Sequence, residues 1–154
     1  MIRKTLILMV ILLSSCTTSQ TRPHPEGISS TNLNQGIQII APAAWNTFRL
    51  GDAISLQIIN ISTETLAFDK DFGIRIFIFK DDQWAETRNK LISVGFDNII
   101  MKPPTNNKNE TRGYSINPDI GEITSTALIR IYVFGKSSNK NELLGAFVDV
   151  YLNP

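Results

Sequence analysis

Two segments of this chain repeat the same alternation of side chains. Residues 74–79 read Ile-Arg-Ile-Phe-Ile-Phe, and residues 129–134 read Ile-Arg-Ile-Tyr-Val-Phe. Successive side chains of a β-strand point to opposite faces of a sheet, so this period of two places the aliphatic residues on one face and the Arg and aromatic residues on the other. A helical period would mix the two sets. The pattern therefore predicts strands with one aliphatic, core-facing side.

Further strand patterns recur at short intervals, and no stretch shows the 3.6-residue apolar period over the about 11 residues that a helix needs. Asp81, Asp82 and Gln83 separate two of these patterns closely enough for a hairpin. We expect an all-β fold, an antiparallel two-sheet sandwich of about seven to nine strands. The spacing resembles that of immunoglobulin-like domains, without the Cys and Trp signature of antibody domains. The expected strands are 36–41, 53–61, 65–69, 74–80, part of 84–94, 98–102, 113–116, 127–135 and 143–152.

Charged side chains indicate which face of these strands looks outward. Arg and Asp disfavour a dry core, whereas Ile and Val fit one, so the faces that carry Arg75, Arg130 and Asp149 should lie outside. If the three strands are neighbours, their aromatic residues form one exposed patch, and such patches usually mark contact surfaces. The predicted partner-binding residues are Arg75, Phe77, Phe79, Arg130, Tyr132, Phe134, Phe147 and Tyr151.

A purely structural role for these aromatic residues is the alternative. Cross-strand aromatic pairs stabilise sheets, Arg stems cover rings, and Asp149 could pair with an Arg. The segment 103–112, with two prolines and a polar run, should form an exposed mobile loop and could lie over the patch. Trp45 and Trp84 each lie beside a turn, where a half-buried edge position is favoured over a sugar-binding platform.

The N-terminal residues carry a leader pattern. Arg3 and Lys4 precede an apolar run, and residues 13–16 read Leu-Ser-Ser-Cys, with Cys16 the only cysteine. The run at 6–13 is eight residues, about 12 Å of helix, too short to cross a hydrocarbon core of about 30 Å. The segment resembles the signal peptide of bacterial lipoproteins, whose Leu, two small residues and Cys mark the site of cleavage and acylation.

This resemblance implies a location in the cell envelope. Cys16 would become the mature N-terminus, carry fatty acyl chains such as palmitate and attach the protein to a membrane, facing away from the cytoplasm. Thr17, in place of an Asp, slightly favours the outer membrane over the cytoplasmic membrane. The expected organisation is a signal peptide at 1–15, a lipidated Cys with a flexible tether at 16–35, of about 60 Å contour length, and a β-sandwich domain at 36–154.

Catalytic motifs are scarce in this sequence. His24, the only histidine, lies in the predicted tether, so Ser-His-Asp and Cys-His sites lack a base, and zinc sites lack ligands. Asp69 and Asp71 supply only a fragment of a calcium site, which needs six to eight oxygens. We expect no enzyme, no cofactor and no metal. Asn60-Ile-Ser62 and Asn109-Glu-Thr111 match glycosylation acceptors by chance.

Charge argues against a nucleic-acid partner. Without the leader, which takes Arg3 and Lys4 with it, the chain has 13 Lys and Arg against 14 Asp and Glu, and no basic stripe. The favoured interpretation is a membrane-anchored, non-catalytic binding or scaffold module for an envelope protein or glycan. The alternatives are an inhibitor that inserts the loop 103–112 into an exported protease and, third, a carboxylate-dependent hydrolase.

Overall fold

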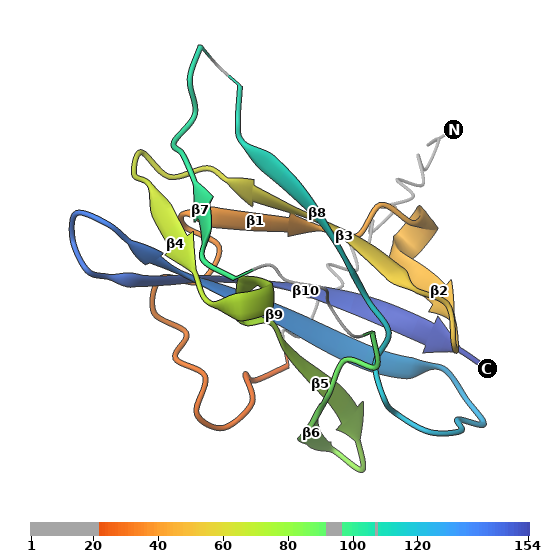
Figure 1. Cartoon of the computed structure of the whole chain (residues 1–154). Coiled ribbons are helices and arrows are strands. Elements are labelled where there is room, and N and C mark those ends of the chain that lie inside the picture. The colour runs from red at the N-terminus through yellow and green to blue at the C-terminus, as the bar shows by residue number, and fades with distance from the viewer. Residues whose placement is uncertain (1–21, 92–96, 107) are drawn as a thin grey trace, which may run out of the picture.

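The structure is a computed structural model that describes residues 22–91, 97–106 and 108–154. The predicted leader at 1–15, the predicted lipid site Cys16 and residues 92–94 of one expected strand lie outside these residues. Two sheets pack face to face, one with the order β1-β3-β8 and one with the order β2-β10-β9-β4-β7, to which β5 and β6 are added through β9 (Figure 1). The strands are β1 (Ile37–Ile40), β2 (Thr47–Arg49), β3 (Ile54–Asn60), β4 (Leu66–Phe68), β5 (Arg75–Lys80), β6 (Gln83–Thr87), β7 (Ile99–Met101), β8 (Thr111–Ile116), β9 (Ala127–Ser137) and β10 (Leu143–Asn153).

The predicted all-β sandwich is confirmed, and each of the nine expected strands coincides with a strand of the structure. The orders β1-β3-β8 and β5-β9-β10 follow the A-B-E and C-F-G orders of immunoglobulin-like sandwiches. The tenth strand, β2, was not expected from the sequence. It has three residues and pairs in parallel with the end of β10, so its position depends on a distant strand rather than on a local pattern.

The aliphatic faces form the core between the sheets, as the alternation predicted. Ile129, Ile131 and Val133 of β9 are fully buried there, together with Ile76 of β5 and Val150 of β10. β9 lies between β5 and β10 and is buried on both faces along most of its length. Its outward side chains are therefore covered by something other than the second sheet.

A short 3-10 turn, η2 (Lys70–Gly73), separates β4 from β5, although both strands pair with β9. Asp71 and Phe72 have positive φ angles of 55° and 60°, conformations that are uncommon for residues other than glycine. The turn places Phe72 in the core, where its ring lies 5.4 Å from that of Phe68 and 5.7 Å from that of Tyr114. Burial of this ring offsets the strained backbone.

Asn60, at the end of β3, is fully buried. Its side chain joins β3 to the following loop at residues 62–64 and to residues 101–102 at the end of β7. Its Nδ2 atom donates to the carbonyl oxygens of Glu64, Met101 and Lys102 at 2.8, 3.2 and 2.9 Å. Its Oδ1 atom accepts from the backbone and hydroxyl of Ser62. The amide is thus committed to the fold, and the glycosylation motif that begins there is not accessible.

A second 3-10 turn, η1 (Ala44–Asn46), leads into β2. Over the described ranges, none of the helical segments is long and apolar enough to cross a membrane.

Candidate functional site

The outward side chains of β5, β9 and β10 form one continuous face, as predicted for neighbouring strands. The register places Arg75 of β5 opposite Tyr132 of β9, and Tyr132 opposite Phe147 of β10. The structure therefore brings the predicted site residues together. We call this surface the outer face, and it consists of Arg75, Phe77, Phe79, Arg130, Tyr132, Phe134, Phe147, Asp149 and Tyr151.

The centre of the outer face is covered, so the prediction of an exposed patch is wrong there. Tyr132 is 0% exposed, Arg130 2% and Phe77 3%, whereas Tyr151 at the end of β10 is 43% exposed. The structural alternative was correct that Asp149 pairs with an Arg. The predicted loop 103–112 is not the cover, because its described residues before β8 project away from the sandwich between β7 and β8 (Figure 1).

Residues 22–28 provide the cover, and we call them the N-terminal arm. Pro25 is buried, and the ring of His24 lies edge-on to that of Phe147, with 5.1 Å between the centroids. The hydroxyl of Tyr132 lies 2.7 Å from Nδ1 of His24, so it donates to this nitrogen when the imidazole is neutral.

The packed arm differs from the flexible tether predicted for 16–35. Proline has a fixed φ angle and no N–H group, so a segment with Pro23 and Pro25 loses little backbone freedom on docking and leaves few donors unpaired. The described chain is folded against the sheet from residue 22 onward, 14 residues before the predicted domain boundary.

Arg130 is the centre of the covered site. Its Nε and Nη2 atoms donate to the two carboxylate oxygens of Asp149 at 2.6 and 2.8 Å. The guanidinium carbon also lies 4.7 Å from the ring centroids of both Trp84 and Phe147. The ion pair and the two rings hold the guanidinium in one orientation.

The remaining donors of the site contact the backbone of the arm. Nη1 of Arg130 donates to the carbonyl oxygens of Arg22 and Pro23 at 3.1 and 3.4 Å. The indole Nε1 of Trp84, on β6, donates to the same Pro23 oxygen at 2.8 Å. The guanidinium of Arg22 lies 4.5 Å from the ring centroid of Phe79. The hydrogen bonds that Arg130 and Trp84 donate to the arm therefore go to its backbone carbonyl oxygens.

Burial also sets the protonation state at the arm. Desolvation and the positive charge of Arg130 lower the pKa of His24 below its ordinary value of 6.5, against a smaller opposing effect of Asp149. Desolvation raises the pKa of Tyr132 above its ordinary value of 10.0. Both side chains are therefore neutral near pH 7, which matches the hydrogen bond between them.

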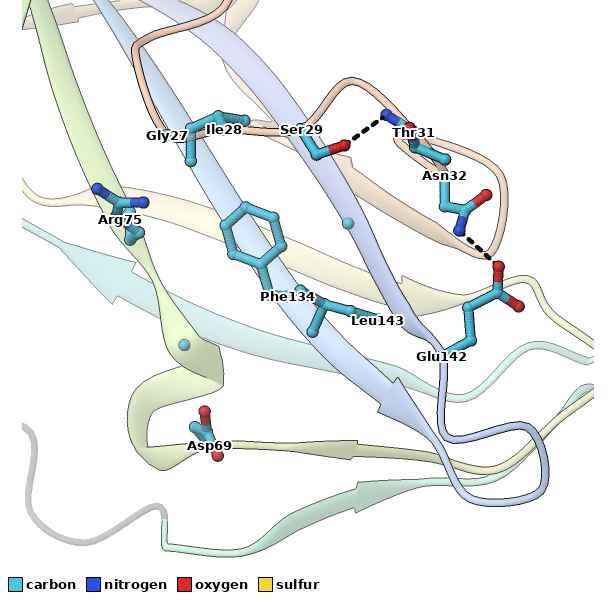
Figure 2. Close-up of a pocket in the computed structure, with 12 residues that line it drawn as sticks. Gly27, Ile28, Ser29, Thr31, Asn32, Asp69, Arg75, Phe134, Glu142 and Leu143 are labelled. Atoms are coloured by element: carbon cyan, nitrogen blue, oxygen red, sulfur yellow. Dashed lines mark hydrogen bonds between the residues drawn. The ribbon is translucent and has the colours of Figure 1, made fainter.

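A cavity of about 530 Å³ opens under the end of the arm and the loop that leads from it to β1. Figure 2 shows Gly27, Ile28 and Ser29 arching over Phe134, with Arg75 at one side of the space. At the far end of the loop, Asn32 donates to Glu142 at 2.5 Å (Figure 2). The loop is thus fixed at its end by this hydrogen bond, whereas the cavity lies beneath the rest of it.

The aspartates singled out from the sequence lie at two turns. Asp69 and Asp71 flank the start of η2, and Asp81 and Asp82 form the two-residue turn between β5 and β6, with positive φ angles of 51° and 60° at the turn residues. Within residues 22–91, 97–106 and 108–154, no three His, Cys, Asp or Glu side chains are grouped so that they could hold a metal ion.

The two tryptophans differ from each other. Trp84 is half-buried on the edge strand β6, as predicted. Trp45 is 92% exposed with a φ angle of 58°, so the prediction of a half-buried edge position is wrong for this residue. Arg22, Pro23 and His24, which contact the outer face, were not among the residues predicted for the site. The signal that could have identified them is the histidine between two prolines, a stiff segment with a ring at its centre.

Comparisons with protein families, curated proteins and solved structures give no match for this chain.

Proposed function

We propose that this protein is a lipid-anchored, non-catalytic binding module of the bacterial cell envelope, attached through Cys16 and facing away from the cytoplasm. The observation that carries the binding role is Arg130. This buried cation is oriented by Asp149, and its Nη1 atom donates to the backbone of the N-terminal arm, a segment that adds no strand to the sheet.

The arm determines how far the module can stand from its proposed anchor. Five residues separate Cys16 from Arg22, so the two positions are six steps apart, at most about 21 Å at about 3.5 Å per step. This is much shorter than the about 60 Å expected for a tether that extends to residue 35. On this proposal, the outer face is kept near the lipid surface while the arm is docked.

Lipid attachment is tested in cells that express the full chain and a Cys16→Ser variant. We expect the wild type in the detergent-soluble membrane fraction, with a mass that corresponds to removal of residues 1–15 and addition of acyl chains. The variant should keep its leader and carry no acyl chains. An unmodified Cys16 in a wild-type protein that fractionates with soluble proteins would contradict the anchor.

The binding role is tested by photo-crosslinking in cells from Tyr151, the exposed end of the outer face. Gln57, an exposed position on β3 of the opposite sheet, serves as the matched control. We expect cross-links to an envelope protein from position 151 and not from position 57. Cross-links to an exported protease from Thr105, in the projecting segment between β7 and β8, would instead favour the inhibitor.

A further inference from the structure

We propose that the N-terminal arm is an intramolecular ligand in a peptide-binding groove, and that the groove takes a proline-containing extended segment of a partner protein when the arm lifts. This inference rests on the proposed binding role and specifies the chemistry of the partner.

The first argument is the chemistry of the contacts. Arg130 and Trp84 donate to carbonyl oxygens of residues 22 and 23, which any extended peptide carries. A proline at the position of Pro23 fits this arrangement, because the groove offers donors to the peptide and a proline has no N–H group to leave unpaired. Aromatic grooves are the usual surfaces for segments that proline holds in an extended form.

The second argument is the side-chain positions along the groove. The ring of Phe79 receives the cation of Arg22, and the space beside Phe147 and Tyr132 receives the ring of His24. Pro25 is buried next to them. The matching ligand is therefore a cationic residue followed by proline, a ring-bearing or hydrogen-bond-accepting residue and a second proline.

The third argument is that the arm can leave without disrupting the fold. Residues 22–28 add no strand to the sheet, and the first bridge between the N-terminal segment and β10 is at Leu33 and Gly145. The loop between the arm and this bridge lies over the cavity of about 530 Å³. Lifting the arm thus breaks its contacts with the outer face and exposes that face to solvent, while the core between the two sheets stays intact.

The fourth argument is that the groove keeps its shape when the arm is gone. The ion pair of Arg130 with Asp149 and the contacts of its guanidinium with Trp84 and Phe147 all lie within β6, β9 and β10. A ligand would meet donors that are already oriented, which lowers the entropic cost of binding. The arm competes at the high effective concentration of a tethered ligand, so weakening it should strengthen binding of a free peptide.

The test uses the mature chain, residues 16–154, with Cys16→Ser, and a fluorescent peptide Thr-Arg-Pro-His-Pro-Glu-Gly that copies residues 21–27. Fluorescence anisotropy reports binding. The variant His24→Ala removes one hydrogen bond of the docked arm, and a net hydrogen bond of ordinary strength corresponds to about a fivefold change in an equilibrium. We expect this variant to bind the peptide about fivefold more tightly than the wild type. His24→Gln, with a side chain that can still accept a hydrogen bond, should fall between the two.

Two controls make the result specific. A peptide with alanine at the three central positions, Thr-Arg-Ala-Ala-Ala-Glu-Gly, should not bind. Trp84→Phe is made in a chain that begins at Ser29 and so has no arm to compete; it keeps an aromatic ring but loses the Nε1 donor, and it should bind the peptide about fivefold more weakly than the same shortened chain with Trp84. The near-ultraviolet circular dichroism spectrum checks that each variant is folded.

Three outcomes would overturn the inference. These are absence of saturable binding to both His24 variants, equal binding of the alanine peptide, and a wild-type dimer in light scattering that exchanges arms between copies. The proposed function is tested separately, because attachment through Cys16 and cross-linking from Tyr151 do not require peptide binding. A protein that is anchored and cross-links but does not bind the peptide refutes only this inference.

Discussion

The Nδ1 atom of His24 lies 2.7 Å from the hydroxyl oxygen of Tyr132, a residue 108 positions further along the chain. This contact joins the N-terminal arm to the centre of the outer face. Both groups are neutral in the contact, because burial and the neighbouring Arg130 lower the pKa of His24 and burial raises that of Tyr132. Protonation of His24 would place a second positive charge beside Arg130 and turn the acceptor Nδ1 into a donor.

Arm docking should therefore depend on pH. The pKa of His24 is lower in the docked arm than its ordinary value of 6.5, so the free arm binds the proton more tightly. Docking should be complete above pH 6.5 and weaken progressively as the pH falls below that value towards the docked pKa. The charged groups around the imidazole are Arg130 and Asp149 on the sheet and Arg22 on the arm.

Trp84 reports this transition, because its indole donates to the arm. Its fluorescence is measured between pH 8 and 4.5 in a Trp45→Phe background, where it is the sole tryptophan. The matched control His24→Gln should show no change near pH 6. A transition of equal size in the control would assign the pH dependence to another group.

The pair of Arg130 and Asp149 should be strongly coupled. Arg130→Met leaves the Asp149 carboxylate, whose side chain is 33% exposed, without its partner, and we expect a loss of about 2 kcal/mol in the free energy of unfolding. The double variant Arg130→Met with Asp149→Leu removes both charges and should recover most of this loss. Urea denaturation of the wild type, both single variants and the double variant gives the interaction free energy between the two side chains. If the double variant were no more stable than Arg130→Met, the unpaired carboxylate would not be the cause of the lost stability.

Asn60 should be among the polar residues most important for stability. Asn60→Ala removes the donor shared by three carbonyl oxygens in a fully buried position, and we expect a loss of about 3 kcal/mol. The exposed Asn109 is the matched control, and Asn109→Ala should change stability by less than about 0.5 kcal/mol. Thermal unfolding of the two variants side by side decides this. Similar midpoints would contradict the buried network.

The side chain of Trp45 should contribute nothing to the stability of the fold. It is 92% exposed at a φ angle of 58°, where asparagine is better tolerated than other residues that have a side chain. Trp45→Asn should therefore be more stable than Trp45→Ala by about 1 kcal/mol, because alanine keeps the left-handed strain. Urea denaturation compares the two. Equal stability of the two variants would mean that the turn relaxes when the indole is removed.

The strands and the core could be predicted from local patterns. Alternation alone assigned Ile76, Ile129 and Ile131 to the core and Arg75 and Arg130 to the opposite face, because a period of two separates the faces without knowledge of strand partners. The short strand β2 and the turn η2 could not be predicted in this way. Both depend on partners distant in sequence: β2 on the end of β10, and the strained Phe72 on the rings of Phe68 and Tyr114.

The residues of the candidate site could be predicted from the sequence, but their burial under the arm could not. The sequence of β5, β9 and β10 determined that an aromatic face with two arginines lies outside the sandwich, because a charged side chain strongly disfavours the dry core. The segment 22–28 is polar and rich in proline, so composition alone suggested a tether. Its docking depends on carbonyl oxygens, which every residue carries and no sequence pattern reveals, meeting donors of Arg130 and Trp84. The sequence by itself therefore determined the sandwich, its core and its outward residues, and only the tertiary structure decided that the arm covers them.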